Sequence, residues 1–170
     1  VSQVDTTGGR ITIAGQNISP VTMSNVTVYI GSTVCSELAT IIPYISISCN
    51  TQSGSGGAFN VTVEQNGQVG ELVAGFSYSI PYVQNVSVVN TSGGNITIRG
   101  ASFGVKGARV LIGGSACLVI RQSHTELVCR LDQGGLSGSR PVRVNVSGLV
   151  SLAVYAFSYS PPVAEHIEAV

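Results

Sequence analysis

The sequence predicts an all-β fold made of two tandem β-sandwich domains. Three observations support this prediction: a set of landmarks recurs in the same order along the chain, apolar residues alternate with polar ones, and Gly- and Ser-rich stretches interrupt the alternating runs. A period of two is typical of half-buried strands, because successive side chains of a strand point to opposite faces of the sheet.

The internal repeat divides the chain into domains. The recurring landmarks, paired by position, are Gly8–Ile13 with Gly93–Ile98, Val28–Gly31 with Val110–Gly113, Cys35 with Cys117, Cys49 with Cys129, and Phe76–Ser79 with Phe157–Ser160. The spacing changes only in Gly- and Ser-rich stretches, where loops accept insertions, so the pattern indicates a tandem duplication. We therefore expect one domain over residues 1–80 and a second over residues 81–162.

Each domain is expected to contain about seven short strands. The alternating runs are rich in residues that favour a pleated sheet, and they include Ile11/Ile13, Val26/Val28/Ile30, Val61/Val63, Val86/Val88, Ile96/Ile98 and Val142/Val144/Val146. The segments 53–57 and 134–138 supply turns, and no segment has a helical stripe. This pattern describes two sheets packed face to face, as in an immunoglobulin-like sandwich.

Composition excludes several classes of protein. Hydrophobic residues make up 44% of the chain and charged residues only 9%, so intrinsic disorder is not expected. The eight basic and eight acidic residues are scattered and cancel, which leaves no basic face for nucleic acid. No apolar run is long enough to span a bilayer, so no membrane insertion is expected within this segment.

The four cysteines are expected to form disulfides. They fall two per repeat, which favours the pairs Cys35–Cys49 and Cys117–Cys129, although four cysteines allow three connectivities. Zinc binding and four unpaired buried thiols are the alternatives, but the Cys-x-x-Cys spacing of a structural zinc site is missing. Disulfides would place the chain in an oxidising compartment of the secretory pathway, outside the cell or at its surface.

Acceptor sequences for N-linked glycans are over-represented. Seven of the nine asparagines begin an Asn-x-Ser/Thr sequence, where about two would arise by chance: Asn17, Asn25, Asn60, Asn85, Asn90, Asn95 and Asn145. Asn17 is the weaker acceptor because Pro20 follows its sequence. Strand parity points Asn25, Asn60, Asn95 and Asn145 away from the core. We expect covalent glycans at most of these sites, where they would keep a charge-poor surface soluble.

No catalytic, cofactor or metal site is expected. His124 and His166 have no nucleophile or orienting acid at a recognisable spacing, and the acidic residues are isolated from one another. The aromatic residues Phe76, Tyr78, Phe157 and Tyr159 could suggest a sugar-binding platform. Their parity instead predicts that they pack in or along the core.

Each repeat resembles the IPT/TIG family of immunoglobulin-like, E-set domains. The resemblance is carried by the block Gly-Gly-x-Ile-Thr-Ile-x-Gly, then Val-x-Ile-Gly, a cysteine pair, an alternating Val strand and a closing Phe-Ser-Tyr. It covers both repeats nearly end to end. Neither repeat has the Pro-rich opening that is common in receptor versions of the family. The resemblance implies an extracellular adhesion or surface protein.

The expected function is that of a non-catalytic structural or adhesive glycoprotein. The chain would be a segment of a rod-like tandem array that forms a cell-surface stalk or filament, because few residues separate the two repeats. Its partners would be other repeats of the array, copies of itself or another cell-surface protein. The alternative is a ligand-binding, plexin-like receptor ectodomain in which these repeats are spacers.

Residues 163–170 are expected to begin a third repeat or to form a linking strand. Ile167 to Val170 align with Val86 to Val89, and Ile167 and Ala169 would be the inward side chains. A lone strand is not stable in water. The segment from Pro162 should therefore pair with a continuing third repeat or with a neighbouring copy, in register with the site of residues 1–4.

Overall fold

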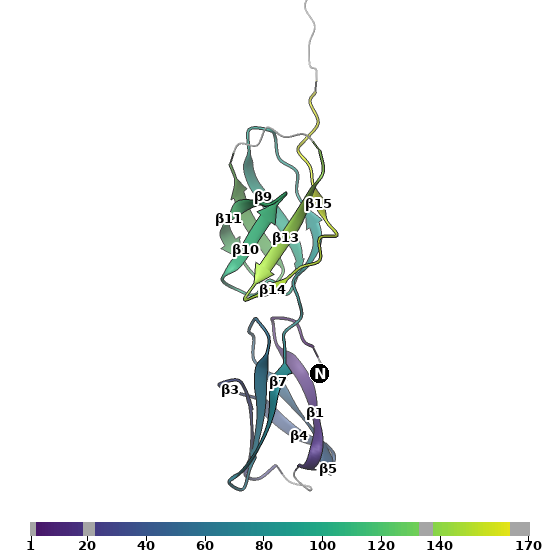
Figure 1. Cartoon of the computed structure of the whole chain (residues 1–170), viewed down its shortest axis with the longest axis vertical. Helices are drawn as coiled ribbons and strands as arrows, with labels where there is room; N and C mark the ends of the chain where they lie inside the picture. Colours follow the sequence, from purple (N-terminus) through teal and green to yellow (C-terminus); the bar gives the residue numbers. More distant parts are fainter. Residues whose placement is uncertain (1–2, 19–22, 133–137, 164–170) are drawn as a thin grey trace, which may run out of the picture.

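The structure is a computed structural model that describes residues 3–18, 23–132 and 138–163. The described residues form strands, turns and loops and contain no helix, which confirms the all-β prediction. Figure 1 shows two domains stacked end to end along the long axis. No helix among the described residues could cross a membrane.

The first domain is a sandwich of two antiparallel sheets. One sheet has the order β1-β5-β4 and the other has the order β3-β2-β6-β7. The strands, in chain order, are β1 (Gly9–Ile18), β2 (Val26–Ile30), β3 (Thr33–Val34), β4 (Ser36–Ile42), β5 (Tyr44–Thr51), β6 (Phe59–Gln65) and β7 (Gln68–Phe76).

The second domain repeats this arrangement, and its described strands also include β8. Its strands are β8 (Tyr82–Val86), β9 (Gly94–Ala101), β10 (Ala108–Ile112), β11 (Ser115–Gln122), β12 (Glu126–Leu131), β13 (Arg140–Val146), β14 (Leu149–Val150) and β15 (Ala156–Phe157). They follow the order β14-β13-β10-β11-β12-β9-β8, and β15 pairs with β13. Two layers of antiparallel strands in each repeat confirm the predicted sandwich.

Backbone hydrogen bonds confirm that the two domains are copies of one unit. Ser79 N–H donates to the carbonyl of Val4 at 2.8 Å. The corresponding bond in the second domain joins Ser160 N–H to the carbonyl of Val89 at 2.9 Å. In both domains the segment before the first long strand therefore lies beside the segment that closes the domain.

The alternating apolar residues form one core in each domain, as the period of two predicts. In β2, Val26, Val28 and Ile30 are buried while the residues between them are partly exposed. The expectation for the opening strand of the second domain is only partly correct. Val88 is 58% exposed, and the core residue of β8 is Val83, which is 1% exposed. A register shift between Val83 and Asn85 breaks the simple alternation.

One strand in each domain crosses from one layer to the other, and the disulfide lies at the crossing. In the second domain Cys117 pairs with Val110 in the layer of β10, whereas the next residue, Leu118, pairs with Arg130 in the layer of β12. Cys117 is bonded to Cys129 of β12. The disulfide thus joins the two layers where β11 leaves one for the other.

The first domain has the same crossing, but the strand that crosses is interrupted at the cysteine. Here β3 and β4 replace the single strand β11, and Cys35 stands between them. Cys35 N–H donates to the carbonyl of Val28, and Ser36 already pairs with Asn50 of the other sheet. Cys35 is bonded to Cys49 of β5, so both disulfides are within a domain, and no described cysteine is free.

We predict that removing either disulfide destabilises its own domain. Each closes a loop of roughly 15 residues, which corresponds to about 3 kcal/mol in the free energy of unfolding. The double variant Cys117→Ala/Cys129→Ala should lose about this amount in guanidinium unfolding of the second domain. Peptide mapping without reductant should recover Cys35–Cys49 and Cys117–Cys129 from the unmodified chain. Alkylation of either pair without reductant would contradict the disulfide assignment.

Candidate functional site: the joint between the domains and the glycan acceptors

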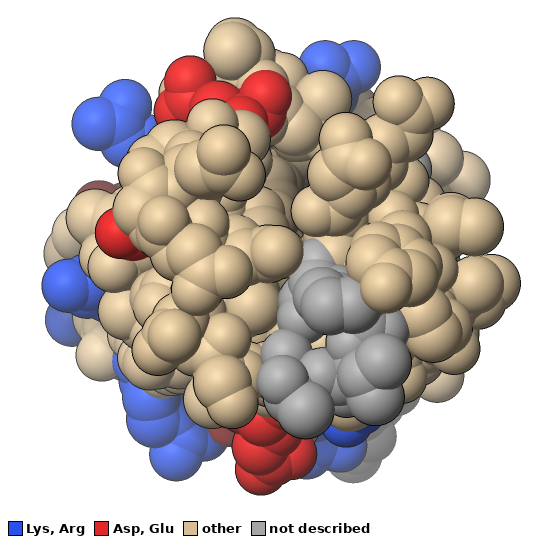
Figure 2. Space-filling view, turned by 90° about the horizontal axis from the view of Figure 1, so that it is seen from below, with Lys and Arg blue, Asp and Glu red and all other residues tan. Residues whose placement is uncertain are grey.

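The ionisable residues do not assemble into a reactive site. Among the described residues no three His, Cys, Asp or Glu side chains lie together in a group that could hold a metal ion. Glu126 forms ion pairs with Arg99 and Arg121, and the side chains of both arginines are exposed to solvent. Figure 2 views the molecule from the free end of the first domain, and charged side chains lie around the edge of that view.

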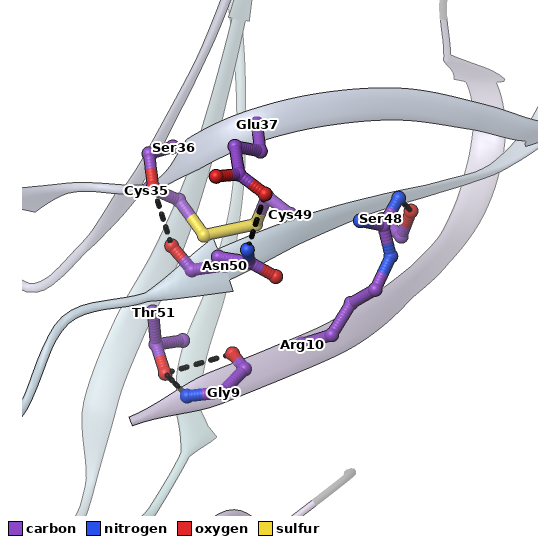
Figure 3. The surroundings of a disulfide bond; sticks show 9 residues. All are labelled: Gly9, Arg10, Cys35, Ser36, Glu37, Ser48, Cys49, Asn50 and Thr51. Atoms are coloured by element: carbon purple, nitrogen blue, oxygen red, sulfur yellow. Dashed lines mark hydrogen bonds between the residues drawn. A yellow bond between two sulfur atoms is a disulfide. The ribbon is translucent and has the colours of Figure 1, made fainter. Parts of the chain in front are cut away.

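The side chains around the first disulfide hydrogen-bond to one another and bury the sulfur atoms. Figure 3 shows the disulfide of Cys35 and Cys49 beside hydrogen bonds that join Ser36 and Glu37 to Asn50. Asn50 donates to Glu37 Oε2 at 2.6 Å, and Ser36 Oγ donates to the carbonyl of Asn50 at 3.4 Å. Both cysteines are almost fully buried, which keeps the sulfur atoms away from solvent.

The closing Phe-Ser-Tyr motif belongs to the core. Phe76 and Phe157 are each 1% exposed, and each stacks edge-on against the tyrosine two residues later. The hydroxyl of Tyr78 donates to the carbonyl of Gln52 at 2.7 Å, and burial raises the pKa of this phenol. The predicted packing of these rings is confirmed, and they form no exposed sugar-binding platform.

A buried hydroxyl is at the centre of the contact between the domains. Thr6 is in the turn before β1 and is 1% exposed. Gly104 N–H of the second domain donates to Thr6 Oγ1 at 3.1 Å, and the same hydroxyl is hydrogen-bonded to His124 Nδ1 at 2.8 Å. A buried polar group without a partner is costly, so these two bonds favour one relative position of the domains.

Two further hydrogen bonds extend this contact, which we call the joint. Ser102 Oγ donates to Asp5 Oδ1 at 3.0 Å, and Ser102 is 3% exposed. On the other side, the hydroxyls of Ser55 and Ser147 are 2.9 Å apart. The joint therefore has polar contacts on two loops of the first domain, one before β1 and one before β6.

Close packing and a short connection complete the joint. Gly56 has a φ of +100°, and a Cβ there would lie 3.2 Å from Cβ of Ser147 in the other domain. The connection between β7 and β8 is residues 77–81, and Pro81 within it is buried. Figure 1 shows that this connection runs directly from the upper end of the first domain into the second.

None of the seven predicted glycan acceptors is buried in the core. The five asparagines with exposed side chains are Asn17, Asn25, Asn85, Asn90 and Asn95. The remaining two are partly buried on strands: Asn60 donates to Glu71 Oε1 at 3.0 Å, and Asn145 Oδ1 accepts from Gly148 N–H at 3.1 Å. Glycan occupancy at all seven positions stays a prediction.

A family model described as the IPT/TIG domain matches residues 2–80 and again residues 81–160. The chain belongs to the IPT/TIG domain family. The two matches correspond to the two sandwiches, each with its crossing strand and its disulfide.

Relatives of this IPT/TIG chain include one curated protein and several solved structures. Mouse (Mus musculus) fibrocystin-L is 31% identical over 157 residues, which is 88% of this chain and 4% of the relative. A surface glycan-binding protein from Prevotella bryantii has a TM-score of 0.53 at 12% identity, over 86% of this chain and 36% of the other. The plexin A4 extracellular region has a TM-score of 0.45 at 18% identity, over 94% of this chain and 15% of the other. The chain thus spans a small part of each.

The residues of the joint were not predicted from the sequence. No role was expected for His124 or for the isolated acidic residues, yet His124 and Asp5 both contact the other domain. His166 lies outside the described residues. A signal was available for Thr6, because the repeat places Thr91 at its counterpart position and preserves the turn. Nothing in the sequence shows that this turn touches the next domain.

We predict that Thr6→Val loosens the joint. Valine keeps the shape of threonine but leaves Gly104 N–H without its acceptor, which corresponds to about 1–3 kcal/mol for a buried group. Small-angle X-ray scattering should show a broader distribution of interatomic distances for this variant than for the unmodified chain. Thr7→Val is the matched control, because the Thr7 side chain is exposed and contacts only its own turn. Identical scattering from Thr6→Val and the unmodified chain would contradict the role of Thr6.

Proposed function

We propose that this chain is a non-catalytic, N-glycosylated, extracellular segment of a semi-rigid rod, built from IPT/TIG domains in a surface stalk or filament. The observation that carries the proposal is the joint. Two sandwiches connected by residues 77–81 are held end to end by buried hydrogen bonds on Thr6 and Ser102. A short connection combined with specific contacts favours a fixed spacing rather than free rotation.

The covalent features support the extracellular part of the proposal. Both disulfides are buried at the crossings between layers, where they stabilise small domains in an oxidising compartment. The sequence has seven glycan acceptors and only 9% charged residues. Glycans would cover apolar surface that charge does not, including Val69, Leu72 and Val73 of β7, which are all more than half exposed. Asn60 lies beside this strand, and its Oδ1 accepts from Ala74 N–H at 2.9 Å.

The distribution of chemical groups supports a role without catalysis or cofactors. The histidine of the joint is hydrogen-bonded to a threonine of the other domain, and no described acid lies in a cluster with it. Formal net charge is zero, which supports protein partners over nucleic acid. We propose that the partners are neighbouring repeats or further copies of this chain.

We predict that the native protein loses mass in several discrete steps when an endoglycosidase acts on it under native conditions. Loss of the glycans should also promote aggregation, because exposed valine, leucine and isoleucine side chains would become accessible to other molecules. Intact mass spectrometry and light scattering measure the two effects. Protein treated with heat-inactivated enzyme is the control, and an unchanged mass after active treatment would contradict the proposal.

A further inference from the structure

Charge cancels over the whole chain but is divided unevenly between the two domains. Residues 1–80 contain one basic and four acidic residues, which gives a formal net charge of −3. Residues 81–162 contain seven basic and two acidic residues, which gives a formal net charge of +5. The two domains share one fold, and equivalent surfaces on them carry opposite charge, as the next two sheets show.

The outer face of the sheet that contains β10 and β13 carries two arginines of the second domain. Arg109 and Arg143 alternate with buried residues on their strands, so both side chains point into solvent. Arg109 pairs with Asn145 and Leu111 pairs with Arg143, which makes the two arginines diagonal neighbours roughly 7–8 Å apart. Leu111 is 41% exposed, and Val150, opposite Asn145, is 42% exposed. We call these five residues the basic face.

The equivalent face of the first domain carries two carboxylates. Glu64 of β6 pairs with Val69 of β7, and Thr62 pairs with Glu71, so the two glutamates are also diagonal neighbours. Parity places them on the outer face, because Val61 of β6 is buried in the core. Val69 lies beside them and is 66% exposed. We call Thr62, Glu64, Val69 and Glu71 the acidic face.

The charges of both faces are without ion-pair partners in the part of the chain that the structure describes. The arginines that form ion pairs there are on the other sheet of the second domain, in β9, β11 and β12. Glu71 accepts a hydrogen bond from the amide of Asn60 at 3.0 Å. The segment that precedes a domain does not reach these faces, because β8 pairs with β9 in the opposite layer.

The two faces lie on one side of the molecule. The turn after β13 contacts the loop before β6: the hydroxyls of Ser147 and Ser55 are 2.9 Å apart, and a Cβ on Gly57 would lie 3.6 Å from Cδ2 of Leu149. One end of β13 is therefore next to the start of β6. Figure 1 shows β10 and β13 of the second domain and β7 of the first on the near side. A second chain lying alongside in the opposite direction would meet both faces at once.

We propose that two copies of this chain pair side by side and antiparallel, with the basic face of each packed on the acidic face of the other. The inference rests on the proposed function, because it names a contact between copies of the rod. A two-fold axis makes the two contacts identical. Two arginines would face two carboxylates of similar spacing, and arginine forms bidentate bonds to carboxylates and is enriched in protein interfaces. Leu111, Val150 and Val69 would be buried between the charges.

One glycan acceptor belongs to each face and would control the contact. Asn145 is part of the basic face, and Asn60 is hydrogen-bonded to Glu71 of the acidic face. These are the two acceptors that are partly buried. A sugar on either asparagine would hold the faces apart, because a glycan is bulky. Copies therefore pair only where both asparagines are free of sugar, and glycosylated copies stay single.

Charge reversal in the full chain tests the pairing. The chain is made in bacteria with an oxidising cytoplasm, so that disulfides form and no glycan is attached. Arg109→Glu/Arg143→Glu reverses the basic face, and Glu64→Arg/Glu71→Arg reverses the acidic face. Arg121→Glu/Arg130→Glu is the matched control, because it makes the same charge change on the other sheet of the second domain, where both side chains are exposed. Circular dichroism on heating verifies that each variant is folded.

Analytical ultracentrifugation measures the dissociation constant of each protein. The unmodified chain and the control should form a dimer, and this dimer should weaken as salt concentration rises. Each reversed variant alone should associate at least about tenfold more weakly than the control, because like charges then face each other. An equimolar mixture of the two reversed variants should form a heterodimer, because one chain then has two acidic faces and the other has two basic faces.

Three results would overturn the proposal. The first is an unmodified, glycan-free chain that stays monomeric, including one that instead binds heparin through Arg109 and Arg143, which would indicate an anionic polysaccharide as partner. The second is charge reversal with no greater effect than the control, or a mixture of reversed variants that stays monomeric. The third is a dimer of secreted protein in which peptide mass spectrometry finds sugar on both Asn60 and Asn145. The glycan mass and the rigidity of the joint are measured separately, so these results would leave the proposed function standing.

Discussion

The crossing of one strand between the two layers is the constraint on which each domain depends. A sandwich of short strands has little core, and the two layers must be held in a fixed register for their side chains to interdigitate. The chain meets this requirement by passing β11 from the layer of β10 to that of β12, and by bonding Cys117 to Cys129 at the crossing. The first domain reaches the same result with β3, β4 and Cys35.

Fixed layers in turn fix the loops at the ends of each domain. The turn containing Thr6 and the loop containing Ser55 emerge at one end of the first sandwich, and they meet loops at the opposite end of the second. The two domains share one fold, so the rod that we propose would repeat a contact of this kind along the array.

Much of the fold could be predicted from the sequence because it depends on local patterns. The period of two places Val26, Val28 and Ile30 in the core, and the matching positions of the cysteines indicate pairing within each repeat. The opening strand of the second domain was harder to predict, because a register shift between Val83 and Asn85 changes the inward positions, and β8 ends at Val86, before the exposed Val88. A bulge of this kind has no clear signal in an alternating run of valines.

The joint could not be predicted from the sequence. Thr6, Ser102 and His124 are common polar residues far apart in sequence, and only the stacking of two folded domains brings them together. The predicted pairing of residues 164–170 lies outside the described residues.

We propose that the joint holds the two domains as one rigid unit. Residual dipolar couplings of backbone amides, measured by NMR in a weakly aligning medium, test this most directly, because each rigid body has its own alignment tensor. We predict that the couplings of both domains fit a single tensor of the same magnitude and orientation. Two tensors of clearly different magnitude would show that the domains move independently and would contradict the account.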